Sequence, residues 1–429
     1  MAKDSTMENT PQDSPFNRTA QHDAKRAAIL SQAAKLFNTK GSRATTLLDI
    51  AQSLGLTKTS LYYYVKTKEE LIYQCYMATL DRHHKTLDEV AVQYRTPVER
   101  AQAFFRMHFE SWLSAEEGKS SHLAALLEIA SLKGEHRSRV EARYIKIFKR
   151  LRENIRDGIA DGSIRPCDST SVTRAMIGSI DWTFSWLQHV PKDTVPEVAQ
   201  KAWDVLWQGL STVKGDYKPA TLLALHNGDT DLQGFDRGEQ NRLKQDAFYK
   251  TGTWFFNKKG FTSTSLDEIA DHLNVTKGAF YYHIKNKEDL LFNCYLRSMD
   301  IIAGIYADAA KSEATGMQKI DQTCRRIFYF QNSDQGPLIR YSSITALPKD
   351  SRRQITQRTD KGNQKFGDFI RQGISDGSVR EIDTFVAQNL IAGSINAAMD
   401  MQLWRKVDDI DAAAIDYFEI FFNGLKPRK

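Results

Sequence analysis

The chain has few cysteines for its length and lacks any long apolar run. Its 429 residues include four cysteines, Cys75, Cys167, Cys294 and Cys324, with no CxxC spacing. This pattern predicts neither a disulfide framework nor a zinc site, so no metal or cofactor is expected. No stretch approaches the roughly 18 apolar residues of a membrane span, and the first residues lack the apolar core of a signal peptide. We therefore expect a cytoplasmic protein with no membrane partner.

The sequence contains an internal repeat. Residues 57–71 read TKTSLYYYVKTKEEL, and residues 276–290 read TKGAFYYHIKNKEDL. Between residues 45–71 and 264–290, 13 of 27 positions are identical without a gap, where unrelated segments would share about two. Later matches, RDGIADGSIR at 156–165 with RQGISDGSVR at 371–380, have a shift of 215 instead of 219. The chain is thus a tandem duplication, and the second copy lacks four residues in the loop near residues 114–121.

The repeated stretch predicts short helices separated by a tight turn. Apolar residues at three- and four-residue steps indicate a first helix over residues 23–38, which Gly41 ends. A second helix follows Thr46, and in the other copy Ser265 with Glu268 predicts a capping box at the same place. Thr57 can cap a third helix that runs through Tyr63. A short helix, a tight turn and a second short helix form a helix-turn-helix, whose second helix enters the DNA major groove.

The residue types on this predicted second helix suit DNA. Lys58, Thr59 and Ser60 lie at its exposed leading end, while Tyr62 and Tyr63 have polar tips that can donate to phosphate. Lys68 follows at the N-terminus of the next helix, where free amides favour an anion. A single Tyr or Lys would more often be a half-buried core residue or a solvated charge. Both copies retain this polar and aromatic set, which core packing does not require.

The pattern Thr-Thr, Ile-Ala, Leu-Gly-Leu-Thr-Lys, Leu-Tyr-Tyr-Tyr and Lys-Glu-Glu-Leu resembles the DNA-binding domain of the TetR family of bacterial transcription regulators. The resemblance covers about fifty residues in each half, and Tyr64 departs from the family's usual His. It implies an all-α fold of two units, each a helix-turn-helix domain followed by a larger helical ligand-binding and dimerisation domain. The DNA contacts that it implies in the first copy are Thr46, Thr57, Lys58, Thr59, Ser60, Tyr62, Tyr63 and Lys68. Those in the second copy are Ser265, Thr276, Lys277, Gly278, Ala279, Tyr281, Tyr282 and Lys287. Thr59 and Ser60 are replaced by Gly278 and Ala279, so the two half-sites should differ in sequence.

The repeat and the resemblance divide the chain into six segments. We expect a disordered tail at 1–15, helix-turn-helix domains at 16–71 and 235–290, helical regulatory domains at 72–213 and 291–429, and a linker at 214–234. Residues 21–71 hold eight Lys and Arg against four Asp and Glu, whereas residues 239–290 hold eight against seven. The first module should therefore attract a polyanion more strongly.

Aromatic residues mark candidate ligand and interface positions in the helical domains. The resemblance implies a pocket for a small effector, with apolar lining candidates that are more often plain core: Phe104, Phe105, Trp112, Trp182, Phe328, Phe330 and Phe369. Four-residue spacing places Trp182 with Trp186, Trp203 with Trp207, and Phe418 with Phe422 on shared helix faces. The resemblance implies that the last two helices of each unit form a four-helix bundle, with Trp186, Trp203, Trp207, Phe418 and Phe422 as interface candidates. Both units lie in one chain, so an intrachain pseudo-dimer is expected, and a further homodimer remains open.

Three functions remain at this stage. The first is a regulator that binds a double-stranded DNA operator, most simply a repressor released by a small apolar ligand, with an activator as the alternative. The second is an enzyme with an appended DNA-binding module, which is disfavoured because no Gly-rich phosphate loop, nucleophile elbow or HExxH is present. The third is a non-specific DNA-organising protein, which a steep, sequence-independent salt response would indicate.

Overall fold

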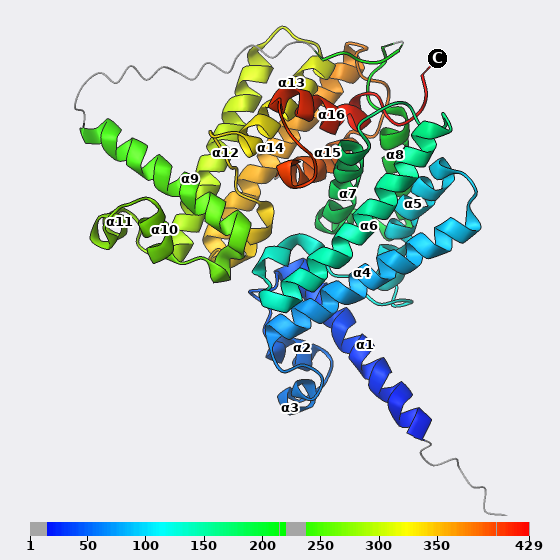
Figure 1. The fold of residues 1–429 in the computed structure, drawn as a ribbon, viewed down its shortest axis with the longest axis vertical. Coiled ribbons are helices and arrows are strands. Elements are labelled where there is room, and N and C mark those ends of the chain that lie inside the picture. The colour runs from blue at the N-terminus through cyan, green and yellow to red at the C-terminus, as the bar shows by residue number, and fades with distance from the viewer. Residues whose placement is uncertain (1–14, 214, 220–236, 400, 429) are drawn as a thin grey trace, which may run out of the picture.

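The computed structural model describes residues 15–213, 215–219, 237–399 and 401–428, and these are almost entirely helical (Figure 1). Apart from one isolated antiparallel bridge between Ser211 and Val379, the described residues form no strand. The first half comprises α1 (Pro15–Lys40), α2 (Leu47–Ser53), α3 (Lys58–Tyr62), α4 (Lys68–Gln93), α5 (Pro97–Glu116), η1 (Leu126–Ser131), α6 (Gly134–Ala160), α7 (Ser169–Trp186), η2 (Leu187–His189), η3 (Lys192–Thr194) and α8 (Val195–Gln208). The second comprises α9 (Arg237–Ser263), α10 (Leu266–His272), α11 (Lys277–His283), α12 (Lys287–Lys311), α13 (Gly316–Asn332), η4 (Tyr341–Ala346), α14 (Lys349–Ser375), α15 (Thr384–Ala397), η5 (Met401–Leu403) and α16 (Ile410–Phe422). The all-α fold expected from the sequence is thus confirmed.

The two halves repeat the same order of helices. The starts of equivalent helices differ by 219 residues from α2 and α10 through α5 and α13. They differ by 215 for η1 and η4, α6 and α14, α7 and α15, and α8 and α16, which places the four-residue loss in the loop after α5 and α13, as predicted. The expected domain boundaries after residues 71 and 290 fall inside α4 and α12, so each of these helices is shared by a DNA-binding module and a regulatory domain. Most of the expected tail and linker lies outside the described residues.

Side-chain caps define the starts of the short helices. Thr57 accepts a hydrogen bond from the Ser60 amide at the start of α3, and Thr276 accepts one from Ala279 at the start of α11. Thr46 forms a full capping box with Asp49. The box predicted at Ser265 is wrong. The Ser265 side chain makes no cap hydrogen bond, and Glu268 forms an ion pair with Lys259 instead of turning back to the helix start.

The halves contact each other along α7 and α15, which cross near the centre of the molecule (Figure 1). Ser179 on α7 donates to the Leu390 carbonyl at 3.0 Å, and Ser394 on α15 donates to the Ala175 carbonyl at 2.6 Å. These residues are repeat equivalents, so the two contacts are reciprocal. A contact in which each partner uses the same residues is the arrangement found across a two-fold axis.

The same reciprocity holds at the repeated RDGIADGSIR motif. Arg165 forms an ion pair with Glu419 at 2.7 Å, and its equivalent Arg380 forms one with Asp204 at 2.6 Å. The Arg165 amide donates to the Leu425 carbonyl, and the Arg380 amide donates to the Leu210 carbonyl, both at 2.9 Å. The last arginine of each motif therefore contacts the C-terminal end of the other half's final helix. Arg165 contacts the end of α16, and Arg380 contacts the end of α8.

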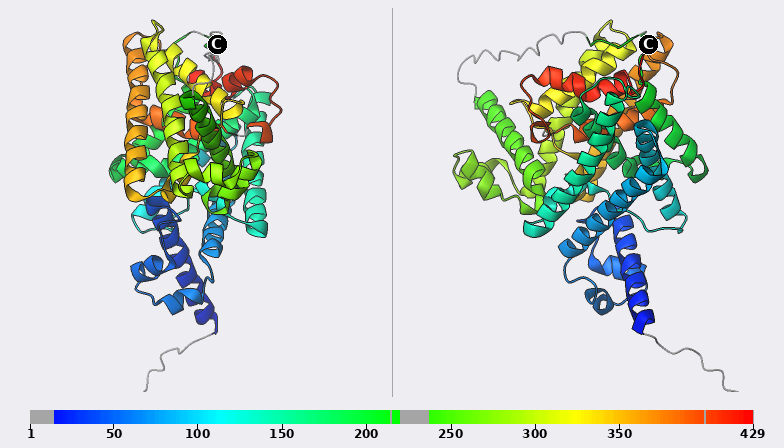
Figure 2. Two further views of the ribbon diagram at one scale, coloured as in Figure 1. Left: turned by 90° about the vertical axis from the view of Figure 1, so that its left-hand side faces the viewer. Right: turned by 45° about the vertical axis from the view of Figure 1, so that its right-hand side comes forward.

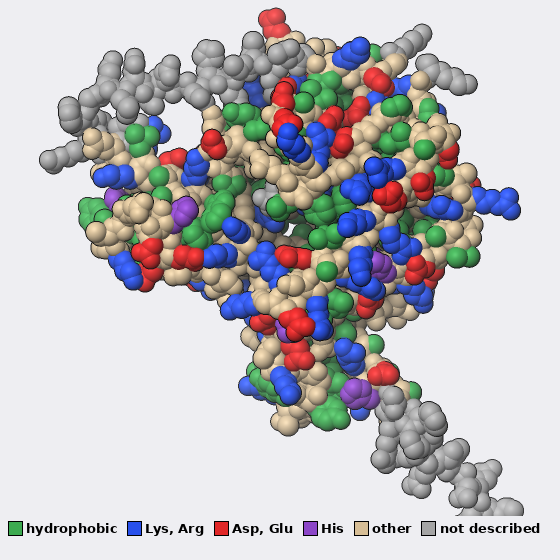
Figure 3. Space-filling view, viewed as in Figure 1, with side chains coloured by type: hydrophobic (Ala, Val, Ile, Leu, Met, Phe, Trp, Pro, Cys, Tyr) green, Lys and Arg blue, Asp and Glu red, His purple; other side chains and the backbone are tan. Residues whose placement is uncertain are grey.

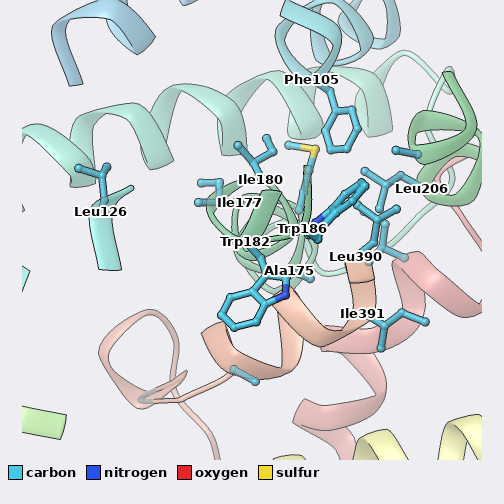
Figure 4. Packing of buried hydrophobic residues seen from close by; sticks show 14 of the residues in the cluster. Phe105, Leu126, Ala175, Ile177, Ile180, Trp182, Trp186, Leu206, Leu390 and Ile391 are labelled. Atoms are coloured by element: carbon cyan, nitrogen blue, oxygen red, sulfur yellow. The ribbon is translucent and has the colours of Figure 1, made fainter. Parts of the chain in front are cut away.

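One apolar core extends through the first half and includes buried residues of α12, α13, α14, α15 and α16. The second helix-turn-helix module has a core of its own, to which η4 contributes. In both views of Figure 2 the first helix-turn-helix module, in blue, projects below the body. Figure 4 shows the central packing around α7, where the rings of Trp182 and Trp186 point in different directions. Both tryptophans lie on α7, but Trp182 packs against Tyr341, whereas Trp186 packs against Phe109 and Phe385. The Trp203 and Trp207 rings do stack, as do those of Phe418 and Phe422.

Candidate nucleic-acid interface and effector cavity

Each helix-turn-helix module presents its recognition helix to solvent. Leu61 and Phe280 anchor α3 and α11 in their modules and are fully buried. The aromatic residues that follow are exposed, with 77% of Tyr63 and 84% of Tyr282 accessible. The remaining predicted contacts on these helices, Lys58, Thr59, Ser60, Tyr62, Lys277, Gly278, Ala279 and Tyr281, are also exposed. Both sets of side chains are therefore accessible to a partner.

The leading ends of the two recognition helices differ in chemistry. In the first module the Ser60 hydroxyl lies 2.8 Å from that of Thr57, which also caps the helix. In the second, Ala279 has no hydroxyl, and Thr276 has only its capping role. Hydroxyl groups can read either a donor or an acceptor on a base edge, while Ala offers only apolar contact. The first module thus presents hydroxyl groups where the second presents a glycine and a methyl group.

The two modules also differ in a carboxylate beside the recognition helix. The repeat alignment alone did not point to this carboxylate. Asp267 accepts a hydrogen bond from Lys277 at 2.6 Å and one from the Tyr281 hydroxyl at 3.1 Å. The Lys277 ammonium holds the pKa of Asp267 below its usual range. The equivalent of Asp267 in the first module is Leu48, and Lys58 lies over the Tyr62 ring, with a distance of 5.7 Å from ammonium to ring centre. A position-by-position comparison of charge between the copies would have revealed this difference.

Lys68 and Lys287 turn toward their own modules. The Lys68 ammonium donates to the Arg43 carbonyl at 3.3 Å, and that of Lys287 donates to the Thr264 carbonyl at 2.9 Å. Burial lowers the pKa of both lysines. These contacts hold each cation at the N-terminus of a long helix, beside the loop that precedes the helix-turn-helix.

Each DNA-binding module also rests on the opposite half. Gly41, at φ +84°, approaches Thr345 so closely that an added Cβ would lie 2.1 Å from that side chain. Its equivalent Gly260, at φ +72°, lies against Ser131 of the first half. Arg43 donates to the Ala346 carbonyl at 3.2 Å and to Glu288 at 2.8 Å. The position of each module therefore depends on the η1 or η4 turn of the other half.

The second half contains a cavity of about 300 Å³, the α12–α15 cavity. It is lined by residues of α12, α13, η4, α14 and α15 and by Trp182 of the first half. Of the aromatic residues named from the sequence, Trp182 lines this cavity and Trp112 lines a small one of about 40 Å³. Phe104, Phe105, Phe328 and Phe369 are packed in the core, and Phe330 is half-buried.

The aromatic interface candidates occupy the α7, α8, α15 and α16 region. Trp186 makes an edge-to-face contact with Phe385 of the second half, with ring centres 5.7 Å apart. Trp203 packs against Phe105 of its own half, and Phe418 against Phe328 of its own half. The carbonyl of Trp207 accepts from Leu425 and Lys426, and Phe422 packs on Tyr217. Trp186 and Trp207 therefore contact residues of the other half directly, and Trp203 and Phe418 support the helices that do.

Charge on the molecule is mixed. Figure 3 shows acidic side chains interspersed with Lys and Arg over the face in view. Among the described residues, no group of three His, Cys, Asp or Glu side chains could hold a metal ion. No described helix combines the length and apolarity required to cross a bilayer.

Comparison with known proteins agrees with this architecture. The family described as bacterial regulatory proteins, tetR family, matches twice, at residues 29–75 and 252–294, and a tetracyclin repressor-like C-terminal domain matches at 94–210. The transposon Tn10 TetC protein of Escherichia coli is 49% identical over 177 residues, which are 40% of this chain and 87% of that protein. The chain belongs to the TetR family. It contains two units of this family in tandem, and it is a DNA-binding regulator of transcription.

More distant relatives each match less than half of this chain. The HTH-type transcriptional repressor KstR2 of Mycolicibacterium smegmatis is 26% identical over 204 residues, covering 46% of this chain and 96% of that protein. The solved structure of the ketosteroid transcriptional regulator KstR2 of Mycobacterium tuberculosis is 26% identical and covers 41% of this chain and 90% of its own, with a TM-score of 0.35.

Proposed function

We propose that this TetR-family chain is a repressor that uses its two helix-turn-helix modules together on one operator with unequal half-sites, and that a small, largely apolar ligand releases it. The reciprocal Arg165 and Arg380 contacts carry this proposal. They favour pairing of the two halves within one chain, where the covalent connection raises the effective concentration of each half for the other. The name of the repressor relative supports the direction of control.

The difference between the recognition helices supports an asymmetric operator. Thr59 and Ser60 offer hydroxyl groups where Gly278 and Ala279 offer none. Bases opposite the first module can therefore be discriminated by hydrogen bonds, and bases opposite the second mainly by apolar contact with a thymine methyl. The second half-site should tolerate more sequence variation.

Native mass spectrometry of the protein on a duplex with one imperfect palindrome tests the pairing. The expected complex contains one chain per duplex. Two chains per duplex, each using one module, would overturn the pairing while leaving DNA binding intact.

A residue exchange tests the base readout. Replacing Thr59-Ser60 with Gly-Ala and Gly278-Ala279 with Thr-Ser in one protein should swap the half-site preferences measured on operators randomised in either half. The loss of a hydrogen-bonded base contact is expected to change discrimination on the order of fivefold to tenfold. Unchanged preferences would show that these positions do not read bases.

A further inference from the structure

The α12–α15 cavity has an apolar interior. Met299 on α12, Ile327 on α13 and Ile395 on α15 line it, within a volume of about 300 Å³. Cavities of this size that are lined mainly by apolar side chains are the usual form of small-molecule sites. The interior therefore suits the apolar body of a small ligand.

One side of the cavity is basic. Arg358, Lys361 and Lys365 follow one another at three- and four-residue steps along α14, so they lie on one face of the helix, and all three are exposed lining residues. The lining residues include no Asp or Glu. Arg358 pairs with Asp300 at 2.9 Å, whereas Lys361 and Lys365 make no ion pair within the described part of the chain. The rim therefore has two ammonium groups outside any ion pair of the described residues. An acidic residue also lies nearby, since the pKa of the lining residue Tyr341, which burial raises most, is also raised by Asp360 on the same helix as the lysines.

The wall also holds a buried polar group without a full set of partners. Gln331 is only 8% exposed, and its side-chain nitrogen donates to the Ile395 carbonyl at 2.8 Å. Its side-chain oxygen accepts no hydrogen bond from the described residues. Buried acceptors are usually satisfied, so a ligand whose body has a hydroxyl or N–H group would gain a contact here that octanoate, which has no donor, does not make.

The equivalent place in the first half is filled by larger side chains. Gly362 corresponds to Ile147 and Asn363 to Phe148, which are 4% and 2% exposed. Phe148 packs against Trp404, with ring centres 4.4 Å apart. Where Gln331 lines the cavity, the first half has Trp112. The second copy thus has open space where side chains fill the first copy.

The short η4 turn connects the cavity with the first DNA-binding module. Trp182 of the first half meets Tyr341 edge to face, with ring centres 5.1 Å apart, and both line the cavity. Tyr341 begins η4, and Thr345 and Ala346 at the other end of η4 contact Gly41 and Arg43 of the first module. One short turn therefore connects the cavity with a DNA-binding module of the opposite half.

We propose that the α12–α15 cavity binds one amphipathic anion per chain, with its apolar body inside and its anionic head on Lys361 and Lys365. Occupation moves η4 through Trp182 and Tyr341, and this shifts the first module. The binding step stands independently, and the shift of the module rests on the proposed repressor function.

Isothermal titration of the DNA-free full chain with octanoate, 1-octanol and octyltrimethylammonium tests the binding step. The expected result is one octanoate per chain, weaker binding of the neutral alcohol and no binding of the cation. Two octanoates per chain, or equal affinity for octanoate and octanol, would overturn the proposal.

Variants locate the site. Lys361→Gln with Lys365→Gln should weaken octanoate binding about tenfold, because two rim charges are lost. The matched control Lys146→Gln, at the position equivalent to Lys361 on α6, should bind octanoate as the wild type does. Gly362→Ile should abolish binding at a wild-type helical circular dichroism signal. Wild-type affinity in both cavity variants would refute the site.

Operator binding is measured separately. Octanoate should weaken the wild-type complex with its operator and leave the Lys361→Gln, Lys365→Gln complex largely unchanged at the same concentration. If octanoate binds as expected but the operator complex is insensitive to it, the cavity assignment stands and the release step fails. If no operator complex forms at all, the proposed function fails and the titration result is unaffected.

Discussion

The crossing of α7 and α15 depends on two glycines, and substitution of Gly393 tests it directly. A Cβ added at Gly393 would lie 2.4 Å from the Trp182 Cβ and 2.7 Å from the Gly178 carbonyl oxygen. Carbon atoms in ordinary contact are about 3.5–4.0 Å apart, so the helices would have to separate by roughly 1 Å. Overpacking of this kind costs about 1–3 kcal/mol, and removing a helical glycine returns up to about 1 kcal/mol. Gly393→Ala should therefore lower the free energy of unfolding by about 1–2 kcal/mol.

Gly304→Ala is the matched control, because Gly304 lies within α12 and an added Cβ there meets nothing within 4 Å. This variant should gain about 1 kcal/mol from helix propensity alone. Urea unfolding followed by circular dichroism compares the two variants.

Gly178→Ala, whose Cβ would lie 2.5 Å from the Ala397 Cβ, should resemble Gly393→Ala. The double variant should lose less than the sum, because one separation of the helices relieves both clashes. Stabilisation by Gly393→Ala equal to that by Gly304→Ala would refute the close contact.

Three further substitutions test individual charges. Asp267→Leu removes the carboxylate that holds Lys277, so affinity for the second half-site should rise and the slope of log K against log salt should steepen by about one in a fluorescence titration. Burial raises the pKa of Asp181 from 3.8 to about 6, so the folded state holds this proton more tightly and stability falls by about 3 kcal/mol as pH rises through that window. Asp181→Asn should remove this fall in urea titrations at pH 4 and pH 7, and an unchanged pH profile would contradict the assignment. Arg165→Gln leaves the half-buried Glu419 without its cation and should cost about 3 kcal/mol of stability, whereas an unaltered urea midpoint would show that the pair contributes nothing.

The DNA-binding modules were the most predictable part of the fold, because their signals are local. Caps such as Thr57 and Asn286 act on amides three residues away, so the sequence contains both partners. The capping box at Ser265 failed for the opposite reason. Glu268 forms an ion pair with Lys259 on the preceding helix. Rules for capping boxes consider only the residues at the helix start, so they cannot predict this ion pair.

Most of the cavity lining escaped prediction because aromatic residues were used as its marker, and of those named only Trp182 lines it. Large side chains fill space, and Phe328 and Phe369 are packed core residues. An open volume is instead made by small residues, and here the informative signal is the replacement of Ile147 by Gly362 and of Phe148 by Asn363 between the copies. Contacts between halves, such as Arg165 with Glu419, could not be assigned from spacing, since they join residues 254 positions apart.

The two copies differ in which functional feature they have. The first module has the hydroxyls of Thr59 and Ser60 and has no counterpart of Asp267. The second half has the open cavity beside Gly362. Two identical subunits cannot specialise in this way, because every substitution alters both DNA-binding modules and both cavities of the dimer at once. A tandem chain is free of that constraint, but a specialised chain then requires a connection from one half to the other. The η4 turn, with Tyr341 at the cavity and Ala346 on Arg43 of the first module, supplies such a connection. If the proposed function and the proposed ligand site both hold, ligand binding in the second half controls the first DNA-binding module, which discriminates between bases more strongly than the second module does.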